Sequence, residues 1–113
     1  MPSYRPESVG KAIQVALSEI LHMETRDPGL SEVTITAVEM SRDLRTARVY
    51  VSVMGEAEAQ IQVLERLMGA MSFFRRALAQ RVHLRHVPEL FFALDDSITQ
   101  GTRIEQLLNS LNT

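Results

Sequence analysis

Two segments rich in β-branched residues, separated by a short turn, constrain the fold of this chain most strongly. Residues 33–40 form the first segment, and residues 47–53 alternate valines with polar side chains, which is typical of a half-buried strand. Between them, Ser41, Arg42 and Asp43 have the composition of a turn. A connection this short joins antiparallel strands, so the sequence predicts a β-hairpin.

Helical patterns lie on both sides of the predicted hairpin. Apolar residues recur at helical spacing from about Pro6 to Glu24. Asp27, Pro28 and Gly29 then predict the end of this helix and a turn. A second apolar stripe follows the hairpin, and its residues are Ala57, Ile61, Leu64, Met68 and Met71.

The second helix is expected to break near the end of its stripe. If it continued straight, Arg75 would enter the buried stripe and Phe73 would face solvent. A bend between Gly69 and Ser72 removes both conflicts and turns Arg76 outward with Arg75. The side chains then expected to pack inward are Phe73, Phe74, Ala77 and Leu78.

A third strand is predicted at residues 90–94, and a shorter helix at about 100–111. The order is therefore helix, strand, strand, broken helix, strand and short helix. This order predicts an α+β fold in which helices pack on one face of a three-stranded sheet. A length of 113 residues suits one domain, which we place at residues 1–113.

Composition excludes several classes of protein. The chain has no cysteine, which rules out disulfides and thiolate zinc sites. No apolar run approaches the ~20 residues needed to span a bilayer, and the polar N-terminal segment does not resemble a signal peptide. We therefore expect a soluble cytoplasmic protein with no membrane partner.

Positive charge is concentrated in one part of an acidic chain. The formal net charge is −2, yet the stretch from 66 to 88 has no acidic residue. Its arginines are Arg66, Arg75, Arg76, Arg81 and Arg85. A local basic surface indicates a polyanionic partner, although a solvated helix face gives the same pattern.

No catalytic or metal-binding motif is present. His83 and His86 are spaced like metal ligands, but a structural zinc ion needs four ligands and only Asp95 and Asp96 could join them. We expect no metal, no cofactor, no catalytic residue and no enzymatic activity. Few aromatic residues are free for base stacking, and Tyr50 is the one on the strand face opposite the valines. This favours recognition of an RNA backbone over reading of its bases.

Several segments resemble the bacterial ribosome-binding factor A family, in order and at the family's spacing. They are RDPGL at 26–30, VT at 33–34, VEMSRDL at 38–44, ARVYV at 47–51, LRHVPEL at 84–90 and DDS at 95–97, followed by Gly101, Ile104 and the leucines at 107–108. The resemblance covers almost the whole chain. It implies a single KH-like domain of the second topology, α-β-β-α-kink-α-β, which agrees with the order predicted above.

The resemblance also implies a function. Members of this family are late assembly factors that bind the rRNA of the small ribosomal subunit, assist its maturation and processing, and matter for growth in the cold. In place of the GXXG loop of other KH domains, they have an Ala-x-Gly kink. Its counterpart here begins at Ala70 and has Ser72 where the family has glycine.

We therefore predict a monomeric ribosome biogenesis factor whose partners are the small ribosomal subunit and its rRNA. The residues predicted to bind RNA are Arg75, Arg76, Arg81, Arg85, Ala70, Ser72, Arg42, Arg45 and Arg48. The alternative is a protein-interaction module that docks on a ribosomal protein or an assembly GTPase through its helices.

Overall fold

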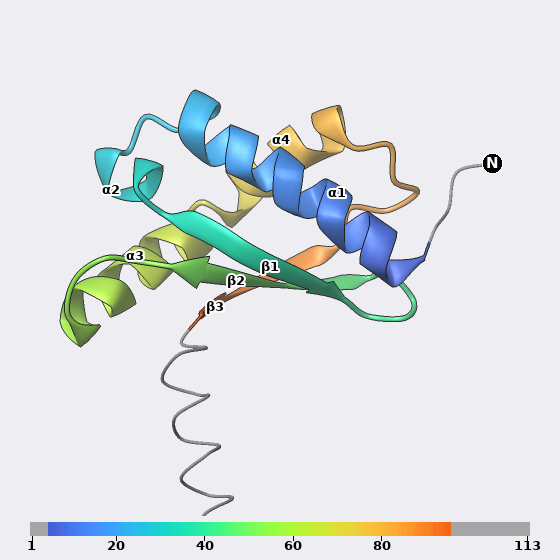
Figure 1. The fold of residues 1–113 in the computed structure, drawn as a ribbon. Coiled ribbons are helices and arrows are strands. Elements are labelled where there is room, and N and C mark those ends of the chain that lie inside the picture. Colours follow the sequence, from blue (N-terminus) through green and yellow to red (C-terminus); the bar gives the residue numbers. More distant parts are fainter. Residues whose placement is uncertain (1–4, 96–113) are drawn as a thin grey trace, which may run out of the picture.

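The computed structural model describes residues 5–95 (Figure 1). The helices are α1 (Pro6–Glu19), continued by a π-helical turn η1 (Ile20–Glu24), then α2 (Pro28–Ser31), α3 (Ala57–Gly69) and α4 (Met71–Arg81). The strands are β1 (Thr34–Met40), β2 (Thr46–Ser52) and β3 (Glu89–Leu94). Apart from the short α2, this is the predicted order, and it is that of a KH-like domain of the second topology. The helix predicted at about 100–111 lies outside the described residues.

The three strands form one sheet in the order β1-β2-β3. β1 and β2 pair antiparallel, which confirms the predicted hairpin, and a bulge lies between Ile35 and Ala37. β2 and β3 pair in parallel, with Thr46 opposite Glu89. The parallel pairing therefore brings the turn between β1 and β2 next to the segment that leads into β3.

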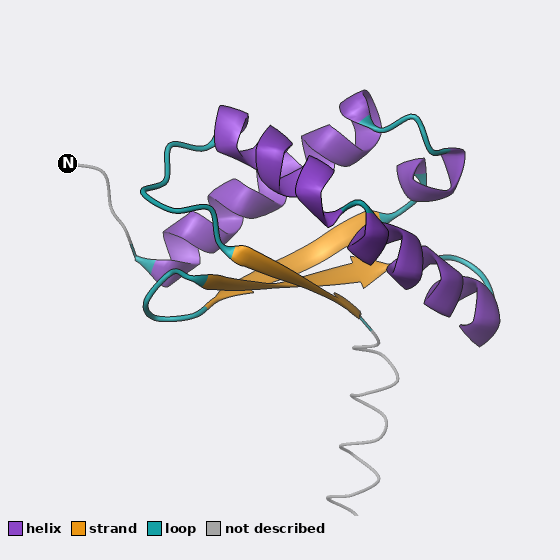
Figure 2. Ribbon diagram, turned by 180° about the vertical axis from the view of Figure 1, so that it is seen from behind, coloured by secondary structure: helices purple, strands orange, loops and turns teal. Residues whose placement is uncertain are grey.

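Helices α1 and α4 cover one face of the sheet, as predicted, and none of the described helices covers the other face (Figure 2). The buried face of α1 continues into η1 and consists of Val9, Ile13, Ala16, Leu17, Ile20 and Leu21. These residues follow the spacing of an amphipathic helix and belong to one buried cluster with the valines of β2 and Ile35 of β1. Within residues 5–95, no helix is both long and apolar enough to cross a membrane.

Gly10 sets how closely α1 approaches β1. A Cβ atom at this position would lie 2.7 Å from the carbonyl oxygen of Val38, which is closer than real contacts of this kind. Gly69, near the kink, has no atom within 4 Å of the equivalent position. Of these two glycines, only Gly10 therefore meets a packing requirement.

The predicted helix break is confirmed, although the buried stripe differs from the expected one. Ala70 separates α3 from α4 with φ −97° and ψ 15°. In α3 the fully buried residue is Leu67, whereas Ile61 and Met68 are each 53% exposed. The buried stripe runs through Leu67, Phe74 and Leu78. Leu64 and Met71 of the predicted stripe are partly buried beside it, together with Val63 and Ala70.

Most residues expected to pack inward from α4 do so. Phe74, Ala77 and Leu78 are buried, and the Phe74 ring lies 5.6 Å from the ring of Phe92. Phe73 is 37% exposed, which corrects the prediction that it is a core residue. It packs edge-on against Phe74, with ring centroids 5.5 Å apart, and so lies at the margin of the core.

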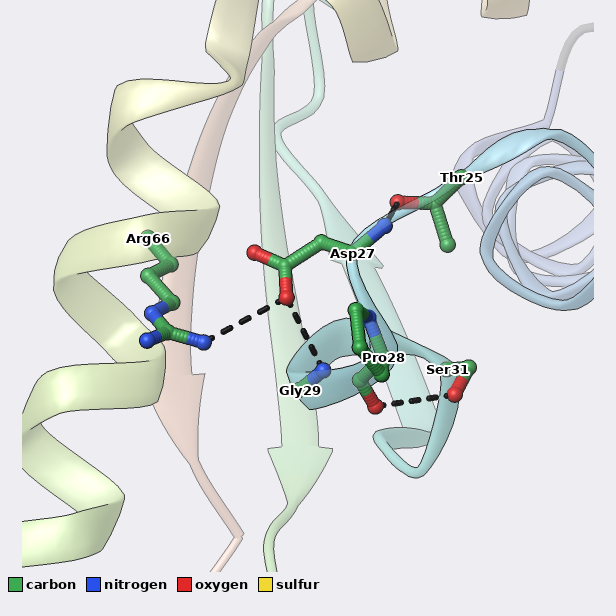
Figure 3. Close-up of polar contacts among 6 residues, drawn as sticks. All are labelled: Thr25, Asp27, Pro28, Gly29, Ser31 and Arg66. Atoms are coloured by element: carbon green, nitrogen blue, oxygen red, sulfur yellow. Dashed lines mark hydrogen bonds and ion pairs between the residues drawn. The ribbon is translucent and has the colours of Figure 1, made fainter.

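The segment predicted as a turn after the first helix forms the short helix α2. The carboxylate of Asp27 accepts a hydrogen bond from the N–H of Gly29 at 2.9 Å and so caps this helix (Figure 3). The same oxygen forms an ion pair with Arg66 of α3 at 3.3 Å. Asp27 thus joins α2 to α3.

Arg81 joins the end of α4 to the end of the first helix. Its guanidinium group pairs with Glu19 at 2.6 Å and with Glu24 at 2.8 Å. In an α-helix, residues five apart are rotated by about 140° and point in different directions. The wider π turn of η1 reduces this rotation, so both carboxylates reach the same arginine. Arg81 Nε is buried with no hydrogen-bond partner among the described residues, which offsets part of the gain.

We predict that Gly10→Ala destabilises the protein by about 1–2 kcal/mol, measured by urea unfolding. The added methyl group must push α1 away from β1, which typically costs about 1–3 kcal/mol, and better helix propensity returns up to about 1 kcal/mol. The matched control is Gly69→Ala, which meets open space and gains the same propensity. If the Gly10→Ala variant were as stable as the control, the close approach of α1 to β1 would not limit the side chain at position 10.

We predict that Arg81→Ala lowers the free energy of unfolding by about 1–2 kcal/mol, because two partly exposed carboxylates lose their partner. Arg76→Ala, on the same helix and without an ion pair in the described part of the chain, should change the stability by less than about 0.5 kcal/mol. Equal effects of the two changes would argue against a structural role for Arg81.

Candidate nucleic-acid interface

The arginines of the basic stretch do not form one continuous set. Arg66 and Arg81 are tied to carboxylates, as described above. Arg75 is exposed and donates from Nη2 to the carbonyl of Val87 at 3.0 Å. For Arg76 and Arg85 there is no ion pair within residues 5–95, and both are exposed. The charges available to a ligand are therefore fewer than the sequence suggests.

Arg75 and Arg76 form what we call the α4 face, the solvent side of that helix. It faces away from the core because Phe74, Ala77 and Leu78 occupy the inner side. The contact between Arg75 and Val87 links this face to the segment 82–88. The structure thus brings the α4 face and the approach to β3 together.

The kink lies at the start of α4. Ala70 donates its N–H to the carbonyls of Arg66 and Leu67 and accepts from Phe74, so the chain bends without opening into a loop. Ser72 is exposed, and no side chain caps the start of α4. Helix starts of this kind attract anions through their N–H groups and dipole. The kink and the far end of α4 are about 16 Å apart at 1.5 Å per residue.

The turn between β1 and β2 and the segment 82–88 lie at the same end of the molecule (Figures 1 and 2). Residues of both segments line a groove. Its volume is about 570 Å³. Its lining residues are Asp43, Leu44, Arg45, Leu84, Arg85 and His86. Two of the predicted RNA-binding arginines, distant in sequence, therefore line one concave surface.

The turn that forms one wall of the groove is held rigidly. Asp43 Oδ1 accepts from Ser41 Oγ at 2.7 Å and from the N–H of Arg45 at 3.1 Å. These hydrogen bonds lower the pKa of Asp43, so its carboxylate is ionised at neutral pH. The N–H of Glu89 donates to the carbonyl of Arg45 at 2.8 Å and ties the turn to β3. Leu44 has φ +61°, a left-handed conformation that costs a residue other than glycine about 1–2 kcal/mol.

Arg48 lies apart from the other candidates. It pairs with Glu39 and with Phe91 in the sheet and lies on the face opposite the helices. Its hydrogen bond with Tyr50 raises its pKa further above the neutral range. Tyr50 is half-buried and donates to Glu39 at 3.4 Å. Arg42 is exposed in the turn between β1 and β2.

Sequence reasoning missed the groove as a site. Asp43, Leu44 and Leu84 were not predicted as functional, and His86 was considered as a possible metal ligand. Within residues 5–95 there is no group of three or more side chains suited to a metal ion. Asp96, a possible ligand in the prediction, lies outside the described residues. A prediction that β2 and β3 pair in parallel would have placed the turn between β1 and β2 beside the segment 82–88 and so indicated the groove.

Comparison with known proteins identifies the family. The family model of ribosome-binding factor A matches residues 5–108. The ribosome-binding factor A of Thermomicrobium roseum is 43% identical over 98% of this chain and 86% of its own length. The crystal structure of ribosome-binding factor A from Thermus thermophilus is 32% identical, covers 80% of this chain and 97% of its own, and superposes with a TM-score of 0.70.

A third relative comes from a ribosomal complex. It is the Thermus thermophilus ribosome-binding factor A homology model that was fitted into the cryo-EM map of a 30S complex with this factor. It is 32% identical, covers 78% of this chain and 92% of its own, and has a TM-score of 0.65. Because sequence and fold agree along nearly all of its length, this chain belongs to the ribosome-binding factor A family.

Proposed function

We propose that this protein is a ribosome assembly factor that binds the rRNA of the small subunit and assists its late maturation and processing. The observation that carries the proposal is the agreement in sequence and fold with the factor fitted into a 30S complex. Family membership over residues 5–108 supports it. The protein acts by binding, as a cytoplasmic monomer without enzymatic activity.

The α4 face makes the first contact with RNA. Arg75 and Arg76 point outward from a rigid helix and neutralise phosphates, which supplies affinity without reading sequence. The start of α4, at Ala70 and Ser72, places backbone donors near the same strand of RNA. Ser72 adds a hydroxyl that can donate to a phosphate oxygen, where the family's glycine has none.

The groove end makes the second contact. Arg45 and Arg85 line it from opposite walls, and Arg42 lies exposed in the adjacent turn. Because Arg81 forms ion pairs with two glutamates, we propose that it positions α4 and does not contact RNA. Arg48 lies on the open sheet face and serves a different surface, so we omit it from this contact.

A second function is favoured by one observation. Ile61 and Met68 are exposed seven positions apart on one side of α3, and Glu58 and Glu65 lie on the same helix. An exposed apolar pair among acidic residues suits a protein partner better than RNA. Docking on a ribosomal protein or an assembly GTPase through α3 is therefore the alternative function, and it is compatible with RNA binding by α4.

We predict that replacing Arg75 and Arg76 together by alanine flattens the salt dependence of RNA affinity. Each phosphate contact contributes about −0.7 to −0.9 to the slope of log K against log salt, so the slope should change by about one to two. The matched control replaces Arg26 and Arg66, which lie near α2, and should leave the slope unchanged. An unchanged slope in a folded Arg75/Arg76 variant would remove these residues from the interface.

We predict that deleting the gene leaves incompletely processed small-subunit rRNA, most visibly in the cold, where misfolded RNA escapes slowly. The protein should sediment with free small subunits in preference to assembled ribosomes.

Arg85→Glu should reproduce the deletion defect because it reverses the charge at the groove, whereas Arg26→Glu should complement normally. Normal rRNA processing and subunit ratios in the cold-grown deletion strain would refute the assembly role, even if the purified protein bound RNA.

A further inference from the structure

The groove has more chemistry than phosphate binding requires. Phosphate recognition needs positive charge and N–H donors, which Arg45, Arg85 and His86 supply. The groove also contains two leucines and the ionised carboxylate of Asp43, which repels phosphate. Its volume of about 570 Å³ is within the range of about 300–1,000 Å³ that holds small molecules. Apolar side chains combined with both a donor and an acceptor are typical of a site for a base.

Asp43 retains half of its hydrogen-bonding capacity. The hydrogen bonds that it accepts from neighbouring residues, Ser41 and the N–H of Arg45, both go to Oδ1. The N–H of Asp43 itself and the charge of Arg45 also stabilise the carboxylate. A carboxylate accepts at both oxygens. Because Oδ1 is fixed by the turn, Oδ2 is held as a positioned acceptor next to the groove.

Asp43 and Arg85 present opposite chemistry from opposite walls. Asp43 comes from the turn between β1 and β2, and Arg85 from the segment 82–88. A planar ligand between them meets an acceptor on one side and a guanidinium group on the other. Leu44 and Leu84 line the same groove and supply apolar contact for a ring face.

Guanine is the base that matches this arrangement. Its N1 and N2 atoms are neighbouring donors on the Watson–Crick edge, and its O6 and N7 atoms are acceptors that pair with arginine. Adenine and cytosine place an acceptor beside their single amino group, and the N–H of uracil lies between two carbonyls. A carboxylate therefore repels part of the Watson–Crick edge of each of the other three bases.

We propose that the groove binds one unstacked guanine, with Asp43 accepting from its Watson–Crick edge and Arg85 donating to its O6 and N7 atoms. Arg45 neutralises the neighbouring phosphate. The inference rests on the proposed function, because rRNA supplies the guanine as an unpaired nucleotide. A free guanine nucleotide has the same base, and the experiment separates the two sources.

The test uses the purified full chain and a short, labelled oligoadenosine RNA with guanosine, inosine or adenosine at one central position. Fluorescence anisotropy should show guanosine binding about tenfold more tightly than adenosine, the discrimination of a good bidentate pair. Inosine lacks the N2 amino group and should fall between them. Asp43→Asn keeps an acceptor for the turn but loses the charge, and should abolish the preference for guanosine.

Two further variants separate base recognition from charge. Arg85→Ala should lower both the affinity and the preference for guanosine, whereas Arg76→Ala should weaken all three RNAs equally. Circular dichroism checks that each variant is folded. Equal affinity of the unmodified chain for guanosine and adenosine overturns the inference, as does a preference that survives Asp43→Asn.

Competition with free nucleotides assigns the source of the base. Guanosine monophosphate should displace the RNA, but only at concentrations well above that of the guanosine RNA itself, because it lacks the flanking phosphates. If guanosine monophosphate binds as tightly as the guanosine RNA, the inference that RNA supplies the guanine is overturned. If the protein binds purified small subunits but shows no preference among the three short RNAs, the guanine site alone is refuted. If it binds neither small subunits nor RNA, the proposed function is refuted.

Discussion

A single apolar stripe runs through α3 and α4, and the interruption at Ala70 lets it pack on two different surfaces. Helix α3, which contains Leu67, lies against β3 and α2, whereas α4, which contains Phe74 and Leu78, lies against α1, η1 and β3. Residues at these spacings lie on one side of a straight helix, which meets only one of those surfaces. The bend supplies the second direction. Arg75 and Arg76 lie on the outer side of α4 because Phe74, Ala77 and Leu78 fill its inner side.

Ion pairing decides which arginines remain available for a ligand. Arg66 is held by Asp27, and Arg81 by Glu19 and Glu24, over sequence separations of 39, 62 and 57 residues. No local pattern in the sequence indicates these pairs, so a run of arginines looks like one uniform basic surface. In the folded chain the same run divides into structural cations and solvent-facing ones.

The secondary structure was largely predictable because each element has its own periodicity. The alternation at 47–53 and the spacing from Pro6 to Glu24 are local signals, and the structure follows both. The predicted stripe of α3 was only partly right: Leu64 packs against the core, whereas Ile61 and Met68 are exposed. Two apolar rows lie side by side on that helix, and only tertiary contact selects the one through Leu67. The break was thus predicted correctly for an incorrect reason. With the true stripe, Arg75 lies outside the buried side whether the helix is straight or bent. The groove was not predictable without the parallel pairing of β2 and β3.

The geometry of the turn between β1 and β2 gives a physical reason to treat the groove as a site. Leu44 adopts φ +61°, a conformation that glycine or asparagine would adopt more easily. The hydrogen bonds of Asp43 and Ser41, together with the tie from Glu89 to Arg45, hold this conformation in place. Strain of this kind persists where surrounding contacts fix it, and it concentrates at functional sites. Because the strained residue itself lines the groove, the stabilising contacts of the turn preorganise one wall before any ligand arrives.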